Sequence, residues 1–380
     1  MFPLSVGVCL SQPHTLIGAH PSYSASIAIR ICPAPHYAAV DDGPHNTCLP
    51  GASPSYLPCP QQDWEGAAAM SNISIRNRML NVQIVDLAVQ SLYTLWLFTK
   101  SDIVTFVLPN TVFGILGALS GLLTNTTTIH PNTHQILSHL PHVVAFNWLN
   151  LLIFDIAYQR LPAAIAEDSL NKPWRPLPRK RITPAAAQTL LLLTIPVVLL
   201  AVYGLGAGPE SAILVALTWM YNDLGGGDDD YRMRNGIIAS AFAVYNAGSL
   251  KLAVGVESTI SSSGLIWIAM ISGVIFTTMH AQDLKDQAGD RRRGRQTVPL
   301  VLGDAVARWT IVLSSAFWAV ACPSFWQMGA NGFLLSGGVA ALVVVRMLRW
   351  RNAKADSKSW KLWAFWTATL YSLPLLKSLS

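Results

Sequence analysis

Long apolar segments separated by short polar loops fill the chain from residue 102 almost to its end. An α-helix needs about 20 predominantly apolar residues to cross the hydrocarbon core of a bilayer, and most of these segments reach or approach that length. The pattern therefore predicts an all-α, polytopic membrane protein. Its nine predicted membrane-spanning helices lie near residues 102–122, 139–160, 184–204, 209–223, 236–255, 263–280, 306–324, 330–348 and 360–377.

Two segments precede the first predicted span. Residues 1–70 are rich in Pro, Ser, His and Cys and show no sustained hydrophobic periodicity, so we expect a disordered or non-conforming extension there. Residues 71–101 include an apolar stretch that carries Asp86 and Gln90, which favours a helical segment at the membrane interface over a span. Residues 102–380 then form the transmembrane domain.

The composition agrees with a membrane protein, because only 12% of the 380 residues are charged, against about 25% in soluble domains. The net charge of +6 is modest, and membrane topology explains it better than a nucleic-acid partner does. We therefore expect no nucleic acid. None of the five cysteines forms a CxxC pair, which argues against a zinc site or a disulfide framework.

Basic residues alternate from loop to loop. Loops 123–138, 205–208, 256–262 and 325–329 contain no Lys or Arg, whereas each loop after the second, fourth, sixth and eighth predicted spans contains at least two. Lys and Arg are enriched in cytosolic loops. The alternation predicts a multi-pass protein with a cytosolic N-terminus, which we expect in the endoplasmic reticulum.

The most unusual charged segment, His280–Thr297, follows the sixth predicted span. Its carboxylates Asp283, Asp286 and Asp290 have the spacing i, i+3 and i+7, so on a helix they share one face. Three unpaired carboxylates that close would repel one another. Mg²⁺ would relieve this repulsion, because it binds a few carboxylates and completes its shell with phosphate and water. A solvated charged loop is the alternative for an isolated DxxD, but the position after an apolar span favours the metal site.

A second polar cluster lies at the end of the second predicted span. Asp155 and Gln159 are four residues apart and share one helical face. An ionisable residue within an apolar span is costly to bury, so it indicates a functional site unless its side chain merely reaches the interface.

The loop that follows contains Glu167 and Asp168 and then the motif Asn171–Leu177. Within this motif Lys172 and Arg175 resemble a clamp for an anion. Basic residues are expected in a cytosolic loop in any case, so the pair is weak support by itself.

The third cluster, Tyr221–Asn235, contains three consecutive glycines and follows the fourth predicted span. Glycines let the backbone approach a ligand closely, and Arg232 and Arg234 are suited to phosphate oxygens. A flexible, solvated acidic turn between two helices is the alternative interpretation.

Together the three clusters predict a site for a diphosphate ester. The acids after spans two and six would hold Mg²⁺ around the diphosphate, while Lys172, Arg175, Arg291 and Arg295 would neutralise it as it leaves. The carbocation left behind needs an apolar cavity with aromatic faces. Candidate aromatic residues in the spans are Phe146, Trp148, Tyr158, Trp219, Phe242 and Tyr245.

Over about residues 100–377 the sequence resembles the UbiA superfamily of intramembrane prenyltransferases. Asp283–Thr297 looks like the second aspartate-rich motif of that family. The first motif departs from the family pattern, because Phe154-Asp155 stands where an Asn-Asp pair is usual and Tyr158 or Gln159 occupies the next carboxylate position. The combination is similar to a fungal subgroup that includes UbiA-type terpene cyclases.

The resemblance implies a UbiA-like bundle over residues 102–380 whose active-site mouth faces the cytosol. It implies metal ligands among Asp155, Asp168, Asp283, Asp286 and Asp290, although the altered first motif leaves the number of metals open. Asp155, Asp283 and Asp286 are the expected catalytic residues. The expected diphosphate-binding residues are Gln159, Asn171, Lys172, Arg175, Arg232, Arg291 and Arg295.

The leading hypothesis is an Mg²⁺-dependent terpene cyclase that ionises farnesyl or geranylgeranyl diphosphate for terpenoid secondary metabolism. The first alternative is a prenyltransferase in which an aromatic or other acceptor captures the cation, and an inactive scaffold is also open. A membrane transporter is an alternative of another class, and it would place charged residues near the bilayer midplane. The predicted spans are nearly uncharged there, with Lys251 as the exception, which argues against a transporter. The sequence leaves the prenyl chain length and the oligomeric state open.

Overall fold

The computed structural model describes residues 64–125, 132–255 and 258–380. Most of the predicted extension 1–70 therefore lies outside the described residues. Nearly all of the described structure belongs to one compact unit, Gly66–Ser380.

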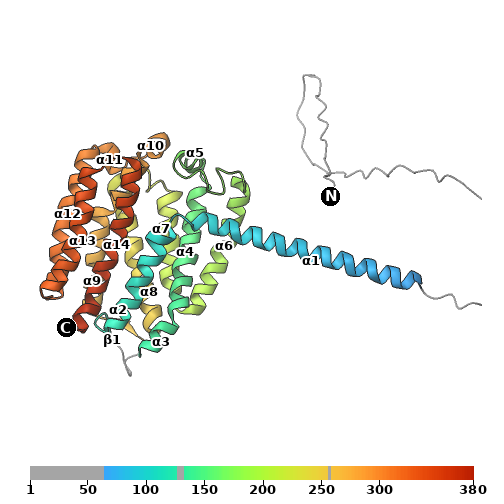
Figure 1. Cartoon of the computed structure of the whole chain (residues 1–380), viewed down its shortest axis with the longest axis horizontal. Coiled ribbons are helices and arrows are strands. Elements are labelled where there is room, and N and C mark those ends of the chain that lie inside the picture. Colours follow the sequence, from blue (N-terminus) through green and yellow to red (C-terminus); the bar gives the residue numbers. More distant parts are fainter. Residues whose placement is uncertain (1–63, 126–131, 256–257) are drawn as a thin grey trace, which may run out of the picture. The chain divides into compact units, whose positions relative to one another are not determined.

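Helices form almost the whole of the described chain, and Figure 1 shows most of them side by side in a bundle. The first half consists of α1 (Trp64–Thr99), the π-helical turn η1 (Ile103–Val107), α2 (Leu108–Ser120), β1 (Thr124–Asn125), α3 (Thr133–Ser138), α4 (Leu140–Gln159), α5 (Pro162–Asn171), α6 (Pro184–Leu205) and α7 (Gly208–Asn222). The second half consists of α8 (Tyr231–Val254), β2 (Thr259–Ile260), α9 (Ser262–Thr278), the 3₁₀ turn η2 (Met279–Gln282), α10 (Asp283–Arg293), α11 (Val298–Val301), α12 (Asp304–Phe325), α13 (Ala330–Arg349) and α14 (Ala353–Ser378).

Each of the nine predicted spans coincides with a helix, but the count of nine is not confirmed. Among the described residues, eight helical stretches are long and apolar enough to cross a membrane. These eight include Asn81–Thr99 of α1 and leave out α7 and α14. α7 has only 15 residues, and the first turns of α14 are rich in lysine. The interfacial position expected for residues 71–101 stays a prediction.

Small and polar residues join the helices at the centre of the bundle. A Cβ atom on Gly114 of α2 would lie 2.6 Å from the carbonyl oxygen of Ser249 on α8, so glycine permits this close approach. Asn147 of α4 donates hydrogen bonds to Thr111 on α2 (3.1 Å) and to Ser249 (2.9 Å). These contacts tie α2, α4 and α8 together without relying on a hydrophobic driving force.

The outer faces of the bundle are apolar. On α6, Leu200 and Tyr203 are 74% and 75% exposed, and on α12 Leu313 and Phe317 point outward in the same way. Exposed apolar surface of this kind is suited to lipid chains rather than water. Lys251, the charged residue within the fifth predicted span, forms an ion pair with Glu210, with 3.3 Å between Nζ and Oε1.

A buried ionic network joins α12, α13 and α14. The Arg308 guanidinium donates to Asp356 at 2.8 and 2.9 Å, to Asp304 at 2.8 and 3.1 Å, and to the carbonyl oxygen of Met347 at 2.8 Å. The side chains of Arg308 and Asp356 are both 2% exposed, whereas that of Asp304 is 37% exposed. The buried half of this network should therefore contribute more to stability than the exposed half.

Replacing Asp356 by asparagine should destabilise the protein by about 2 kcal/mol, because a buried charged hydrogen bond is lost. Thermal unfolding of purified protein in detergent measures this as a lowered Tm. Asp304→Asn is the matched control and should lower the Tm less, since its partner is also held by Asp356. Equal shifts for the two variants would contradict this assignment.

Candidate active site

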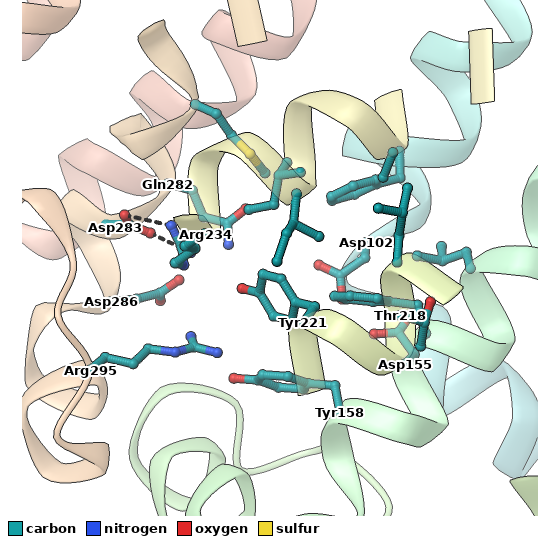
Figure 2. A pocket seen from close by; sticks show the side chains of 18 of the residues that line it. Asp102, Asp155, Tyr158, Thr218, Tyr221, Arg234, Gln282, Asp283, Asp286 and Arg295 are labelled. Atoms are coloured by element: carbon teal, nitrogen blue, oxygen red, sulfur yellow. Dashed lines mark hydrogen bonds and ion pairs between the residues drawn. The ribbon is translucent and has the colours of Figure 1, made fainter. Parts of the chain in front are cut away.

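A pocket lies at the end of the bundle that Figure 1 labels α5 and α10, and Figure 2 shows many of the side chains that line it. It encloses an empty volume of about 900 Å³, including its open mouth. The polar part is lined by Asp102, Asp155, Glu167, Lys172, Arg175, Thr218, Arg234, Gln282, Asp283, Asp286, Asp290 and Arg295. The remaining lining is apolar or phenolic and consists of Phe106, Leu151, Phe154, Tyr158, Leu214, Leu217, Tyr221, Ile237, Ile238, Ala241, Tyr245 and Met279.

Asp283, Asp286 and Asp290 all face this pocket from α10, as their spacing predicts. Asp283 is buried and paired with Arg234 of α8 at 2.8 Å, a contact that Figure 2 marks with dashed lines. Asp286 pairs with its neighbour Lys285. The second carboxylate oxygen of Asp290, Oδ2, is buried without a hydrogen-bond partner among the described residues.

The facing wall is formed by Asp155 of α4 and Asp102, which lies between α1 and η1. Asp155 is 1% exposed, and its Oδ2 also lacks a hydrogen-bond partner in the described part of the chain. Burial alone would raise the pKa of Asp102, but Lys172 and Arg175 outweigh it and lower that pKa to about 2. Asp102 thus remains an anion at neutral pH.

Arg175 holds three carboxylates together. Its guanidinium donates to both oxygens of Asp168 at 3.1 and 2.9 Å and to Asp102 at 2.7 Å, and it lies 3.7 Å from Asp155. Burial opposes its charge, but these acids outweigh burial and raise the pKa of Arg175 above its usual range. Asp168, a predicted metal ligand, therefore engages Arg175 and is not part of the pocket lining.

Several other predicted residues do not line the pocket. Gln159 is fully buried and donates to the carbonyl oxygen of Phe98 at 2.8 Å. Asn171 donates to the backbone carbonyl of Asp286 at 3.2 Å, so it joins α5 to α10. Arg232 and Arg291 are exposed on the protein surface.

Arg234 lines the pocket, whereas Arg232, the predicted diphosphate-binding residue, does not. Residues two positions apart on a helix point about 200° apart, so only one of the pair can face the pocket. Asp230 caps α8 by accepting from the backbone N–H groups of Arg232 and Met233, which fixes the start of the helix. The sequence does not predict Asp102 as a pocket residue, because an acid just before an apolar span is usually an ordinary interfacial residue.

Tyr158 lies where the family pattern led us to expect a carboxylate, and it organises the mouth of the pocket. Its hydroxyl donates to Glu167 Oε2 at 2.7 Å. The guanidinium carbons of Arg293, Arg295 and Arg175 lie 4.8, 5.3 and 5.6 Å from its ring centroid. A ring with this many cations nearby can stack against guanidinium groups and keep them close to one another.

The carboxylates fit a divalent cation that is shared with a phosphate ligand. No group of three His, Cys, Asp or Glu side chains in the described ranges is close enough to hold a metal by itself. Mg²⁺ accepts one or two carboxylates when phosphate and water supply its other ligands. Asp155 and Asp290 both line the pocket, and within the described ranges the Oδ2 atom of each has no hydrogen-bond partner, so both can serve as such donors.

Comparison with known proteins shows the family to which the chain is similar. The model of the UbiA prenyltransferase family matches residues 143–369. The fumagillin β-trans-bergamotene synthase of Aspergillus fumigatus is 30% identical over 315 residues, which cover 77% of this chain and 95% of that protein. A polyprenyl transferase of Hericium erinaceus is 27% identical over 277 residues, which cover 70% of this chain and 88% of that protein.

The fold is shared with a solved structure as well. A UbiA homolog from Archaeoglobus fulgidus superimposes with a TM-score of 0.51 at 11% sequence identity, covering 75% of this chain and 99% of that one. The matched family model covers more than half of the chain and includes both α4 and α10, which supply the facing carboxylates. The chain therefore belongs to the UbiA prenyltransferase family.

Proposed function

We propose that this integral membrane enzyme is a terpene cyclase that ionises farnesyl or geranylgeranyl diphosphate and closes rings within the resulting cation. The observation that carries the proposal is one pocket with a charged mouth and an apolar, aromatic interior. The relative from Aspergillus fumigatus, named as a β-trans-bergamotene synthase, supports a cyclase over other uses of the same site.

In the proposed reaction the bond between the prenyl carbon and the diphosphate oxygen breaks, and its electron pair leaves with the diphosphate. Lys172, Arg175, Arg234 and Arg295 line the mouth and would stabilise the departing negative charge. The prenyl chain would lie against Phe106, Phe154, Tyr221 and Tyr245, which are aromatic residues of the interior. A double bond of the chain then attacks the cation, and loss of a proton or addition of water completes the product.

We assign Asp155, Asp283, Asp286 and Asp290 as the residues that would hold Mg²⁺ at the mouth. When bound there, the metal supplies positive charge that neutralises the diphosphate and lowers the barrier to ionisation. Asp168 remains a candidate ligand only through a rearrangement of Arg175, so we assign it a supporting role. Gln159, Asn171, Arg232 and Arg291 are assigned no direct contact with the diphosphate.

The second candidate is transfer of the prenyl group to an acceptor. It is favoured by the polyprenyl transferase from Hericium erinaceus among the relatives. Both reactions begin with the same ionisation, so the acids and bases of the mouth serve either one. A transporter is not supported, because the chain belongs to an enzyme family and a cluster of acids and bases lines one pocket.

We further propose that the pocket mouth faces the cytosol and that the protein resides in the endoplasmic reticulum. The loops at this end of the bundle carry the basic residues, as the positive-inside rule requires of the cytosolic side. The lipid bilayer and a prenyl diphosphate are the two partners that the proposal requires, and it requires no nucleic acid.

Purified enzyme in lipid nanodiscs, incubated with C10, C15 and C20 prenyl diphosphates and Mg²⁺, should release a cyclic hydrocarbon or alcohol without any acceptor. Mass spectrometry detects the product. Removing divalent metal with EDTA should reduce turnover on the order of a thousandfold, and Mg²⁺ should restore it. Turnover that requires an added acceptor would favour the transferase, and turnover unaffected by EDTA would contradict the metal assignment.

A further inference from the structure

The glycine-rich loop between α7 and α8 carries an acid that touches the arginines of the pocket mouth. Asp228 Oδ1 accepts from Arg295 Nε at 2.9 Å, and Asp228 Oδ2 accepts from Arg293 Nε and Nη2 at 3.1 and 3.0 Å. The backbone N–H of Gln296 also donates to the carbonyl oxygen of Asp228 at 2.8 Å. The loop is thereby fastened to the segment that follows α10.

The three glycines allow this loop to turn back beneath a pocket residue. Gly225 has φ of 76°, in the left-handed region that favours glycine. A Cβ atom on Gly227 would lie 2.5 Å from the ring of Tyr221, so only glycine fits against that ring. The backbone N–H of Asp228 then donates to the carbonyl oxygen of Gly225 at 2.9 Å, which closes the turn and fixes the position of Asp228.

The guanidinium group of Arg295 has contacts at Nε and Nη1 but not at Nη2 among the described residues. Its Nε is bonded to Asp228, its Nη1 lies 3.4 Å from Asp290 and 3.6 Å from Glu167, and its guanidinium stacks near Tyr158. Its Nη2 is buried and has no hydrogen-bond partner among the residues that the structure describes. Figure 2 shows the Arg295 side chain reaching into the pocket between Asp286 and Tyr158.

An unpaired, buried guanidinium nitrogen costs free energy unless a ligand satisfies it. An anionic oxygen in the pocket would do so, because guanidinium groups bind phosphate oxygens with strong, directional hydrogen bonds. We propose that Asp228 is a positioning residue that orients Arg295 so that Nη2 is presented to the diphosphate of the substrate. This inference rests on the proposed function, and it assigns the glycine-rich loop a role in binding the leaving group.

The test is Asp228→Asn, which keeps the size of the side chain and removes its charge. Asp229→Asn is the matched control, because Asp229 is the next residue of the loop, is exposed and makes no ion pair within the described ranges. In Asp228→Asn the KM for the prenyl diphosphate should rise about tenfold, comparable to losing an outer-shell partner, while kcat changes less. The affinity for inorganic diphosphate, measured by calorimetry in nanodiscs, should fall by a similar factor.

A double-mutant cycle tests whether Asp228 acts through Arg295. Once Arg295 is replaced by glutamine, adding Asp228→Asn should weaken diphosphate binding by less than twofold more, whereas independent sites would give additive losses. Additive losses, or a KM and a diphosphate affinity in Asp228→Asn equal to those of Asp229→Asn, would overturn the inference. If the wild-type chain turns over none of the prenyl diphosphates, the proposed function fails instead, and diphosphate binding alone then decides the role of Asp228.

Discussion

Replacing Asp286 by alanine is expected to reduce turnover of prenyl diphosphate on the order of a thousandfold, the size of effect seen when an essential electrostatic contact at a reacting centre is removed. Asp286 lines the pocket, and its only ion pair in the described structure is with the neighbouring Lys285. Its loss leaves Lys285 without an ion pair, but the Lys285 side chain is 15% exposed and keeps access to water. The folded protein should therefore remain intact, with a Tm close to that of the wild type.

Asp283→Ala should abolish turnover as well, but it should also destabilise the fold. Asp283 pairs with Arg234, and both side chains are 2% exposed. Removing one partner of a buried ion pair leaves the other charge buried without a partner, which typically lowers the free energy of unfolding by about 3–5 kcal/mol. The sequence predicts the same metal-binding role for both acids, whereas in the structure Asp283 also holds α8 to α10.

Product formation and Tm measured on the same nanodisc samples separate the two effects. Arg292→Ala is a suitable control, because Arg292 is exposed on the same helix and does not line the pocket. Wild-type turnover in Asp286→Ala would contradict the assignment of Asp286 as a residue that holds Mg²⁺. A wild-type Tm in Asp283→Ala would show that the buried pair with Arg234 contributes little.

Arg175→Ala is expected to remove both activity and a large part of the stability. The sequence predicted a diphosphate clamp, for which the main consequence would be a raised KM. In the structure Arg175 also supplies the charge that Asp102, Asp155 and Asp168 share. Without it the buried carboxylates of Asp155 and Asp168 would lie beside that of Asp102, which is 20% exposed, with no guanidinium between them. We therefore expect a loss of about 3–5 kcal/mol together with turnover below detection.

Arg175→Lys should have an intermediate effect, because a single ammonium group cannot reproduce the forked contacts of a guanidinium. Thermal unfolding and steady-state kinetics provide the readouts. Arg179→Ala in the same loop is the control, since Arg179 is exposed. An Arg175→Ala variant with the wild-type Tm and KM would contradict the central role of this residue.

The membrane-spanning class could be predicted from the sequence because it depends on local apolar length. The shared face of Asp283, Asp286 and Asp290 could be predicted for a similar reason, since helical periodicity alone places them together. The number of spans could not be fixed in the same way. α7 is shorter than a usual span, and the end of α1 is apolar enough to be one.

The composition of the pocket depends on contacts between residues that are distant in sequence. Asp102 joins the pocket because α1 and η1 bring it to Arg175, which lies 73 residues further along the chain. Arg234, and not Arg232, faces the pocket because the Asp230 cap fixes where α8 begins. Asp168 is a ligand candidate by its charge, yet its bidentate contact with Arg175 turns it away from the lining.

The sequence by itself thus determined an apolar helical bundle with three acidic and basic clusters, because these features depend on neighbours within a few turns. Only the tertiary structure decided which charges pair with one another and which remain open to a ligand. The Asp228–Arg295 contact joins residues 67 positions apart, and Nη2 of the same guanidinium has no hydrogen-bond partner in the part of the chain that the structure describes. Such pairings depend on how helices distant in sequence pack, which no local pattern encodes.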